Sequence, residues 1–283
     1  MVEMHEAATI TAEMHLAAMK HARPGMKEYE IVGKVIEVAR SYHGMLSFPV
    51  ICTINGQTLH NHYYGNTLKS GDVLLLDAGA ENKNHYAGDY SHSFPIDHQF
   101  SADQKEIYNI SLNAHKAAVD MVAPGTKMKD VHFAAAASIV DDLKLFGLMK
   151  GDTQEAVVSG AHALFFQCGT GHMIGLDVHD MEDLGEQYVG YSNPEEKETE
   201  LFGLRSLRLG RVLEPGFVIT IEPGIYFNPL LIEMWKAEQR FSEFINYEQA
   251  QKFQHRGGYR SEEMFLITPT GKELVGKDVP KEI

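Results

Sequence analysis

GDVLLLDAG at residues 71–79 and GFVITIEPG at residues 216–224 align without a gap, and this repeat decides the fold. The alignment places Asp77 opposite Glu222, each within an apolar stretch that predicts a buried strand. A second pair of segments agrees: HLAAMKHARPG at 15–25 and HKAAVDMVAPG at 115–125 share a His, an Ala pair and a final Pro-Gly. Two matches in the same order indicate a duplicated helix-and-strand unit.

A duplicated unit that closes on itself predicts that equivalent strands lie side by side across a pseudo-twofold axis. Asp77 and Glu222 would then meet in the middle of the molecule. Burying two carboxylates without a partner is unfavourable by several kcal/mol each or forces their protonation. The repeat therefore predicts a metal, a basic residue or a shared proton between these two side chains.

Two further acidic residues follow the repeated strands. Asp89 lies twelve residues after Asp77, on a strand that returns from a turn at 82–84. In RGGYRSEEMFLIT (256–268), a Gly-Gly turn precedes a strand on which Arg260, Glu262 and Met264 share one face by the two-residue period. The second hairpin thus mirrors the first, and each supplies two carboxylates.

Imidazoles come from the segment between the hairpins. CGTGHMIGLDVHD (168–180) carries His172 and His179, flanked by glycines that permit close backbone approach. The sequence therefore offers four carboxylates and one or two imidazoles to a single site.

Composition limits the class of protein. A chain of 283 residues that is 44% hydrophobic can bury a large core, and we expect one two-lobed domain over 1–283. A formal net charge of −14 argues against nucleic acid as a partner. The absence of a long apolar run predicts no membrane association, and two cysteines indicate no disulfide framework, so a cytoplasmic location is the default.

Apolar periodicity and turn residues predict the elements. We expect helices at 3–22, 27–43, 103–122, 127–147 and 153–163, and strands near 47–54, 72–79, 85–95, 217–223 and 259–268. Residues 228–257 form an insert before the last strand, with helix-like spacing of aromatic and charged residues. This insert is either a lid or a packing element.

The ordered motifs LLLDAG, YAGDYSHSF, GTGHMIGLDVHD, ITIEPGIYF and GGYRSEEMFLIT resemble those of the pita-bread metallopeptidases over nearly the whole chain. Within them, GLDVHD, GLRSLR and the long insert resemble the Xaa-Pro dipeptidase (prolidase) and aminopeptidase P branch. The resemblance implies an α+β fold with a curved antiparallel sheet and helices on its outer face. It also implies hydrolysis of the bond between an N-terminal residue and proline in a small peptide or dipeptide.

The resemblance further implies two divalent metals held by Asp77, Asp89, His172, Glu222 and Glu262. Asp89 and Glu262 would bridge the metals, Asp77 would bind one, and His172 and Glu222 the other. One imidazole among carboxylates suits Mn²⁺, which we expect, or Co²⁺ or Fe²⁺, and Zn²⁺ stays possible. Glu262 is expected to take the proton of the attacking water.

Four further residues match substrate positions of the family. His62 would line the substrate pocket, and His179 would contact the substrate carbonyl and stabilise the developing oxyanion. Arg208 would hold the free carboxylate of a dipeptide, because a guanidinium binds a carboxylate bidentately. Arg260 is expected to act beside the substrate by orienting Asp77 or another site group.

Some of these residues could instead be structural or solvated residues with no role at the site. His62 could be a solvated turn residue, and Arg208 has Arg205 and Arg211 as neighbours on what could be a solvated face. Cys168 stands where the family usually has a His, four residues before the His ligand, and is expected to be a small buried filler.

Three alternatives to the peptidase remain at this point: a catalytically silent partner-binding module on the same fold, a methionine aminopeptidase-like enzyme, and a metal-independent hydrolase of the creatinase type. Members of the branch also carry an N-terminal domain, whereas this sequence opens almost directly on the first expected helix, so we expect a minimal form or a fragment. A homodimer is possible.

Overall fold

The repeated unit of the sequence is present in the computed structural model, which describes residues 1–192 and 195–281. The first unit contains α1 (Val2–His21), α2 (Glu28–Ser41), β1 (Met45–Leu46), β2 (Ile51–Thr53), β3 (Val73–Ala78), β4 (Ala80–Glu81) and β5 (Tyr90–Pro95). The second begins with α3 (Ala102–Met121), α4 (Met128–Leu145) and α5 (Thr153–Ser159), and its strands are β6 (Val218–Ile221), β7 (Gly224–Tyr226), β8 (Gly258–Arg260), β9 (Glu263–Thr268) and β10 (Gly271–Leu274). The expected α+β class is confirmed.

The two units repeat each other in backbone detail. Gly25 and Gly125 end the two Pro-Gly segments with φ of +93° and +89°, a region that favours glycine. The Gly25 amide donates to the Leu68 carbonyl at 2.8 Å, and the Gly125 amide donates to the Leu213 carbonyl at 2.8 Å. Each helix pair is therefore tied in the same way to the segment that leads into the strand of the repeated motif, β3 in the first unit and β6 in the second.

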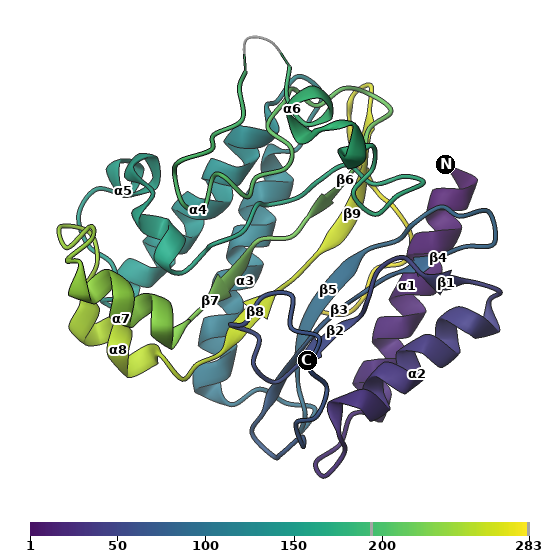
Figure 1. Ribbon diagram of the computed structural model, residues 1–283, viewed down its shortest axis with the longest axis horizontal. Helices are drawn as coiled ribbons and strands as arrows, with labels where there is room; N and C mark the ends of the chain where they lie inside the picture. The colour runs from purple at the N-terminus through teal and green to yellow at the C-terminus, as the bar shows by residue number, and fades with distance from the viewer. Residues whose placement is uncertain (193–194, 282–283) are drawn as a thin grey trace.

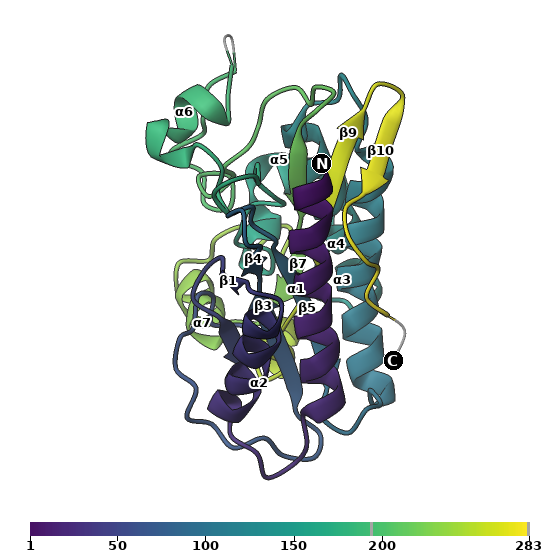
Figure 2. The same ribbon diagram turned by 90° about the vertical axis from the view of Figure 1, so that its right-hand side faces the viewer.

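Helices cover one side of the strands. α1 packs against β3, β4 and β5, and α3 packs against β6, β7 and β8. Both helices lie behind the strands in Figure 1 and run lengthwise beside them in Figure 2, with α2 packed on α1 and α4 on α3. Ser101 begins α3 with a capping box, since its hydroxyl accepts from the Gln104 amide while the Gln104 side chain accepts from the Ser101 amide.

The strands form two three-stranded antiparallel sheets, β2-β3-β5 and β10-β9-β6, with β7 paired to β8. They meet through β5 and the β8–β9 strands, where His92 lies opposite Ser261 and the Glu262 amide donates to the Ser91 carbonyl at 2.9 Å. The expectation that the strands carrying Asp77 and Glu222 would themselves lie side by side is wrong. Instead, β5 and the 261–262 break between β8 and β9 occupy the axis.

The boundaries of the first four helices are confirmed to within two residues. The helix expected at 153–163 is interrupted at Gly160, which has φ of +86° and separates α5 from the 3-10 turn η1 (Ala161–Leu164). The strand expected at 259–268 is broken at 261–262 between β8 and β9, and the one expected at 85–95 begins only at Tyr90. Both breaks adjoin acidic residues that turn toward the site.

The insert at 228–257 contains α7 (Pro229–Ala237) and α8 (Tyr247–Phe253). Trp235 is 1% exposed and belongs to the main hydrophobic core, together with Ile232, Tyr247 and Ala250. The site cavity has no lining residue from the insert, as far as the described residues go. The insert is thus a packing element and not a lid.

In the described part of the chain, no helix is both long and apolar enough to span a membrane.

Candidate metal centre and substrate cavity

All nine residues singled out from the sequence line one cavity of about 270 Å³. Six form what we call the floor: Asp77, Asp89, His172, Glu222, Arg260 and Glu262. The other three, His62, His179 and Arg208, form together with His60 what we call the rim. The floor arises from β3, the ends of β6 and β8, and adjoining loops, whereas the rim arises from loops alone.

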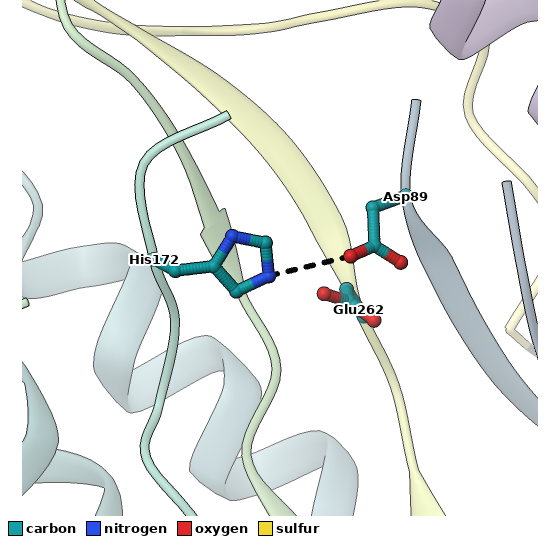
Figure 3. Close-up of side chains that lie close together, drawn as sticks. All are labelled: Asp89, His172 and Glu262. Carbon is teal, nitrogen blue, oxygen red and sulfur yellow. Dashed lines mark ion pairs between the residues drawn. The ribbon is translucent and has the colours of Figure 1, made fainter. Parts of the chain in front are cut away.

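Three floor residues, one from each of three distant segments, converge most closely. Single ligand atoms of Asp89, His172 and Glu262 lie within 4.8 Å of one another, and all three residues are buried. The His172 Nε2 is 3.3 Å from Asp89 Oδ2, the contact drawn in Figure 3, and 3.7 Å from Glu222 Oε1. Asp77 is the fifth acidic or imidazole group of the floor, and its carboxylate is paired with Arg260.

The donor set fits divalent cations. Asp89 Oδ1 and Glu262 Oε1 are buried without a hydrogen-bond partner among the described residues, and buried polar atoms of this kind normally have one. Burial raises the pKa of Glu262 far above its usual range, and the nearby carboxylates of Asp89, Glu222 and Asp77 raise it further. So many carboxylates in one buried place are stable together only with added positive charge or protons.

The pKa of the Asp77 carboxyl group is raised as well. Burial raises the pKa of Asp77 to about 7 against the opposing charge of Arg260, and Asp89 and Glu222 contribute in the same direction as burial. Burial alone would lower the pKa of His172, but its contacts with Asp89 and Glu222 outweigh this and raise it. The floor therefore holds its ionised form poorly without a cation.

Arg260 organises one side of the floor. Its guanidinium donates to Asp77, to Ser91 Oγ at 2.8 Å and to Tyr226 Oη at 3.2 Å. Ser91 in turn donates from its hydroxyl to Glu262 Oε2 at 2.8 Å. Arg260 thus orients Asp77 directly and Glu262 through one hydroxyl, as the sequence led us to expect for Asp77.

The loop that carries His172 lies directly against β6. The His172 amide donates to Thr220 Oγ1 at 3.1 Å, and the Glu222 amide donates to the Thr170 carbonyl at 2.7 Å. A Cβ at Gly171 would lie 2.0 Å from the Thr220 carbonyl oxygen, so only glycine allows this approach. Gly171 therefore sets the distance between His172 and Glu222.

The rim holds His179 and Arg208 through carboxylates. The His179 Nδ1 lies 2.9 Å from Glu182 Oε2, and its ring packs edge-on against His172 with centroids 4.5 Å apart. Arg208 Nη1 pairs with Glu182 and donates to Glu186 Oε1 at 3.1 Å. Burial lowers the pKa of His179 to about 3, and the charges of His172 and Arg208 lower it further.

Two histidines of LHNH face the cavity from the opposite loop. The His62 Nδ1 lies 3.3 Å from the Val50 carbonyl, which places a proton on this nitrogen in the neutral ring. His60 is adjacent to it in the cavity wall, and loss of hydration lowers its pKa, with further lowering by Arg260 and Arg208. Cys168 lines the cavity too; it is half-buried, and its Sγ lies 3.6 Å from Tyr226 Oη.

Four residues of the site escaped the sequence analysis. Ser91 had a usable signal, since it lies two residues after Asp89 and therefore on the same face of the returning strand. His60 adjoins a residue that was chosen. Glu182 and Glu186 gave no signal, because acidic residues in a polar loop are usually solvated and only the fold brings them to Arg208.

Comparison with known proteins agrees with this geometry. Residues 2–269 match the Metallopeptidase family M24. The chain is 36% identical to a Mus musculus Xaa-Pro dipeptidase over 274 residues, and 34% identical to an Escherichia coli Xaa-Pro aminopeptidase over 285 residues. A solved E. coli aminopeptidase P variant in complex with substrate superimposes with a TM-score of 0.77 at 32% identity. The pita-bread fold and the resemblance inferred from the motifs are confirmed.

The chain spans about half the length of these relatives. Its alignment covers 94% of this chain and 54% of the mouse protein, and 99% of this chain and 55% of the E. coli enzyme. The structural match covers 97% of this chain and 54% of the E. coli aminopeptidase P chain.

Proposed function

The chain belongs to Metallopeptidase family M24, and on that premise we propose that it hydrolyses the bond between an N-terminal residue and proline in small peptides. The observation that carries this proposal is the convergence of Asp89, His172 and Glu262 within 4.8 Å on the floor of a cavity. The names of its relatives, Xaa-Pro dipeptidase and Xaa-Pro aminopeptidase, support proline as the second residue of the substrate.

The floor residues would hold two divalent cations, with Asp77, Asp89, His172, Glu222 and Glu262 as ligands. We propose Mn²⁺, because the donors are mainly oxygen and include one imidazole; an E. coli aminopeptidase P has been solved in a Zn-substituted form with product. When bound, such ions activate water and polarise a carbonyl group. The unpartnered oxygens of Asp89 and Glu262 argue against a silent binding module.

Glu262 is the proposed general base. Its Oε2 accepts the Ser91 hydroxyl, which fixes the orientation of the carboxylate, while Oε1 has no partner among the described residues. A fixed carboxylate with one free oxygen can accept the proton of an attacking water within hydrogen-bond reach. Arg260 keeps Ser91 in place, so it supports the base without touching the proton.

Rim residues would bind and orient the peptide. Glu182 fixes the ring of His179, which would contact the carbonyl of the scissile bond. His62, with its Nδ1 proton directed to the Val50 carbonyl, would line the pocket beside His60. Arg208 is the cationic group of the rim and would face a carboxylate that follows proline; Glu222 and His179 both feel its charge.

Three broader proposals accompany this activity. Residues 1–283 would form one catalytic domain, because β5 joins the two units at the axis. We also propose that the enzyme is cytoplasmic, since Cys52 and Cys168 are both free thiols. A homodimer, and the absence of nucleic-acid and membrane partners, also stay proposals, and sedimentation of the metal-loaded chain would test the former.

The activity is tested by release of the N-terminal alanine. The Mn²⁺-loaded chain should hydrolyse alanyl-proline or alanyl-prolyl-alanine at the bond before proline, and it should leave alanyl-alanine intact. A chelator should remove the activity and Mn²⁺ should restore it. Failure to cleave either proline peptide in the metal-loaded state, or cleavage that a chelator leaves unchanged, would overturn the proposal.

A further inference from the structure

Arg208 does not face the cavity as a free cation. Its Nη1 is paired with both Glu182 and Glu186, the latter at 3.1 Å, and all three side chains are only partly exposed. Glu186 is also paired with Lys197, and Glu182 with His179. Two carboxylates thus compensate two full positive charges at one side of the rim.

The position of this cluster matters for substrate choice. Arg208 lines the same cavity as the floor residues, and its charge reaches Glu222 and His60. A peptide whose proline is the last residue would bring its own carboxylate to this wall, whereas a longer peptide would bring an uncharged amide. The carboxylate would have to displace or approach two anions already bound to the guanidinium, and like charges at such range repel.

Resting on the proposed function, we infer that Glu182 and Glu186 determine specificity by lowering the preference of this cavity for a free carboxylate directly after proline. The chain therefore favours peptides that continue beyond proline over Xaa-Pro dipeptides. Arg208 still contributes attraction, but its ion pairs offset it. Electrostatic arrangement of this kind acts on the difference between two substrates and not on the bond-breaking step.

The matched substrates are alanyl-proline and alanyl-proline amide, which differ only in the charge after proline. The readout is the ratio of kcat/KM for the acid to kcat/KM for the amide. Damage to the fold, to the metals or to His179 lowers both values alike and leaves the ratio unchanged. The amide thus serves as the internal control in every variant.

Glu186→Gln is the cleaner variant, because Glu186 contacts Arg208 and Lys197 but Glu182 alone pairs with His179. We expect Glu186→Gln to raise the acid-to-amide ratio about threefold and the double variant Glu182→Gln/Glu186→Gln to raise it about tenfold, which corresponds to ~1.4 kcal/mol. Glu248→Gln, an exposed acid on α8, is the charge-matched control and should leave the ratio as in the wild type.

Different outcomes would overturn the proposed function and the role of Glu182 and Glu186. Hydrolysis of neither substrate by the metal-loaded wild type would overturn the proposed function itself. Hydrolysis of both with an unchanged ratio in the two variants would overturn this inference alone. A ratio that falls in the variants would also overturn it, because the carboxylates would then orient Arg208 for the free carboxylate.

Discussion

The floor and the rim of the cavity are built on different principles. Floor residues other than Glu222 are buried, with Asp89 at 5%, His172 at 4% and Glu262 at 1% exposure. The side chains of His179 and Arg208 on the rim are 36% and 32% exposed and are held by carboxylates of two short helical turns, η2 (Glu182–Leu184) and α6 (Glu186–Val189). Buried charges must be compensated, whereas half-exposed pairs can exchange partners with substrate at small free-energy change.

This difference teaches where chemistry and selectivity reside. The floor favours added positive charge, since the pKa values of Asp77 and Glu262 are raised and two of its buried oxygens have no partner among the described residues. The rim has its charges already paired, and so it can distinguish peptides by what they displace. Variants on the floor should remove activity, and variants on the rim should change substrate preference or rate.

The largest effect is expected from the proposed bridging carboxylates. Asp89→Ala or Glu262→Ala should reduce metal-dependent hydrolysis of alanyl-proline by more than about 10³-fold, because each removes a shared ligand and Glu262 also the base. Circular dichroism should show that the chain stays folded. Glu155→Ala, an exposed acid on α5, is the control. Activity that survives in both floor variants would contradict a two-metal site.

The two histidines of GHMIGLDVH test the boundary between floor and rim. His172→Ala should lower kcat and metal content together. His179→Ala should lower kcat by about 10²-fold while metal content stays near that of the wild type, because its ring only packs on His172 and pairs with Glu182. Paired kinetics and elemental analysis measure both. Full kcat in His179→Ala, or metal loss equal to that of His172→Ala, would show that the two roles are misassigned.

A smaller effect is expected on the rim at Arg208. Arg208→Ala should raise KM for alanyl-proline about tenfold more than KM for alanyl-prolyl-alanine, since Glu182 and Glu186 would then face the free carboxylate uncompensated. Parallel steady-state assays of the two peptides check this. Equal losses for both peptides would identify a structural arginine.

The smallest effect is expected on the free energy of unfolding, from a histidine that packs outside the cavity. His132 supports the His172 loop through Thr170 Oγ1 at 2.8 Å, and burial lowers the pKa of His132 to about 3, with His162 and Lys129 adding to this. The folded chain favours the neutral ring more strongly than the unfolded chain does. The contribution of His132 to the free energy of unfolding is therefore complete above the unfolded pKa of about 6.5. It is lost as pH falls toward 3, by ~1.4 kcal/mol per pH unit.

His132→Gln should accordingly flatten the loss of unfolding free energy between pH 6.5 and pH 4, measured by urea titration of the metal-free chain. His255→Gln, an exposed substitution, is the matched control. Identical slopes for the two variants would show that the His132 ring does not carry this pH dependence.

The sequence placed floor and rim residues in one cavity, but it did not reveal the ion pairs that hold the rim, for physical reasons. Asp77 and Glu222 lie at equivalent points of a repeat, and Asp89 and Glu262 follow from strand period, so local rules place them. The meeting of β5 with β9, by contrast, depends on long-range packing, and the expected pairing of the Asp77 and Glu222 strands was wrong. Contacts such as Glu182 with Arg208 join two loops whose course only the folded chain determines.

Metal stoichiometry tests the central claim most directly. The chain would be loaded with Mn²⁺, freed of unbound metal and measured by elemental analysis alongside hydrolysis of alanyl-prolyl-alanine. The account predicts about two ions per chain, from the five floor ligands and the two-metal chemistry of such sites, and activity that rises and falls with metal content. A chain that stays metal-free after loading, or that hydrolyses the peptide equally well without metal, would contradict it.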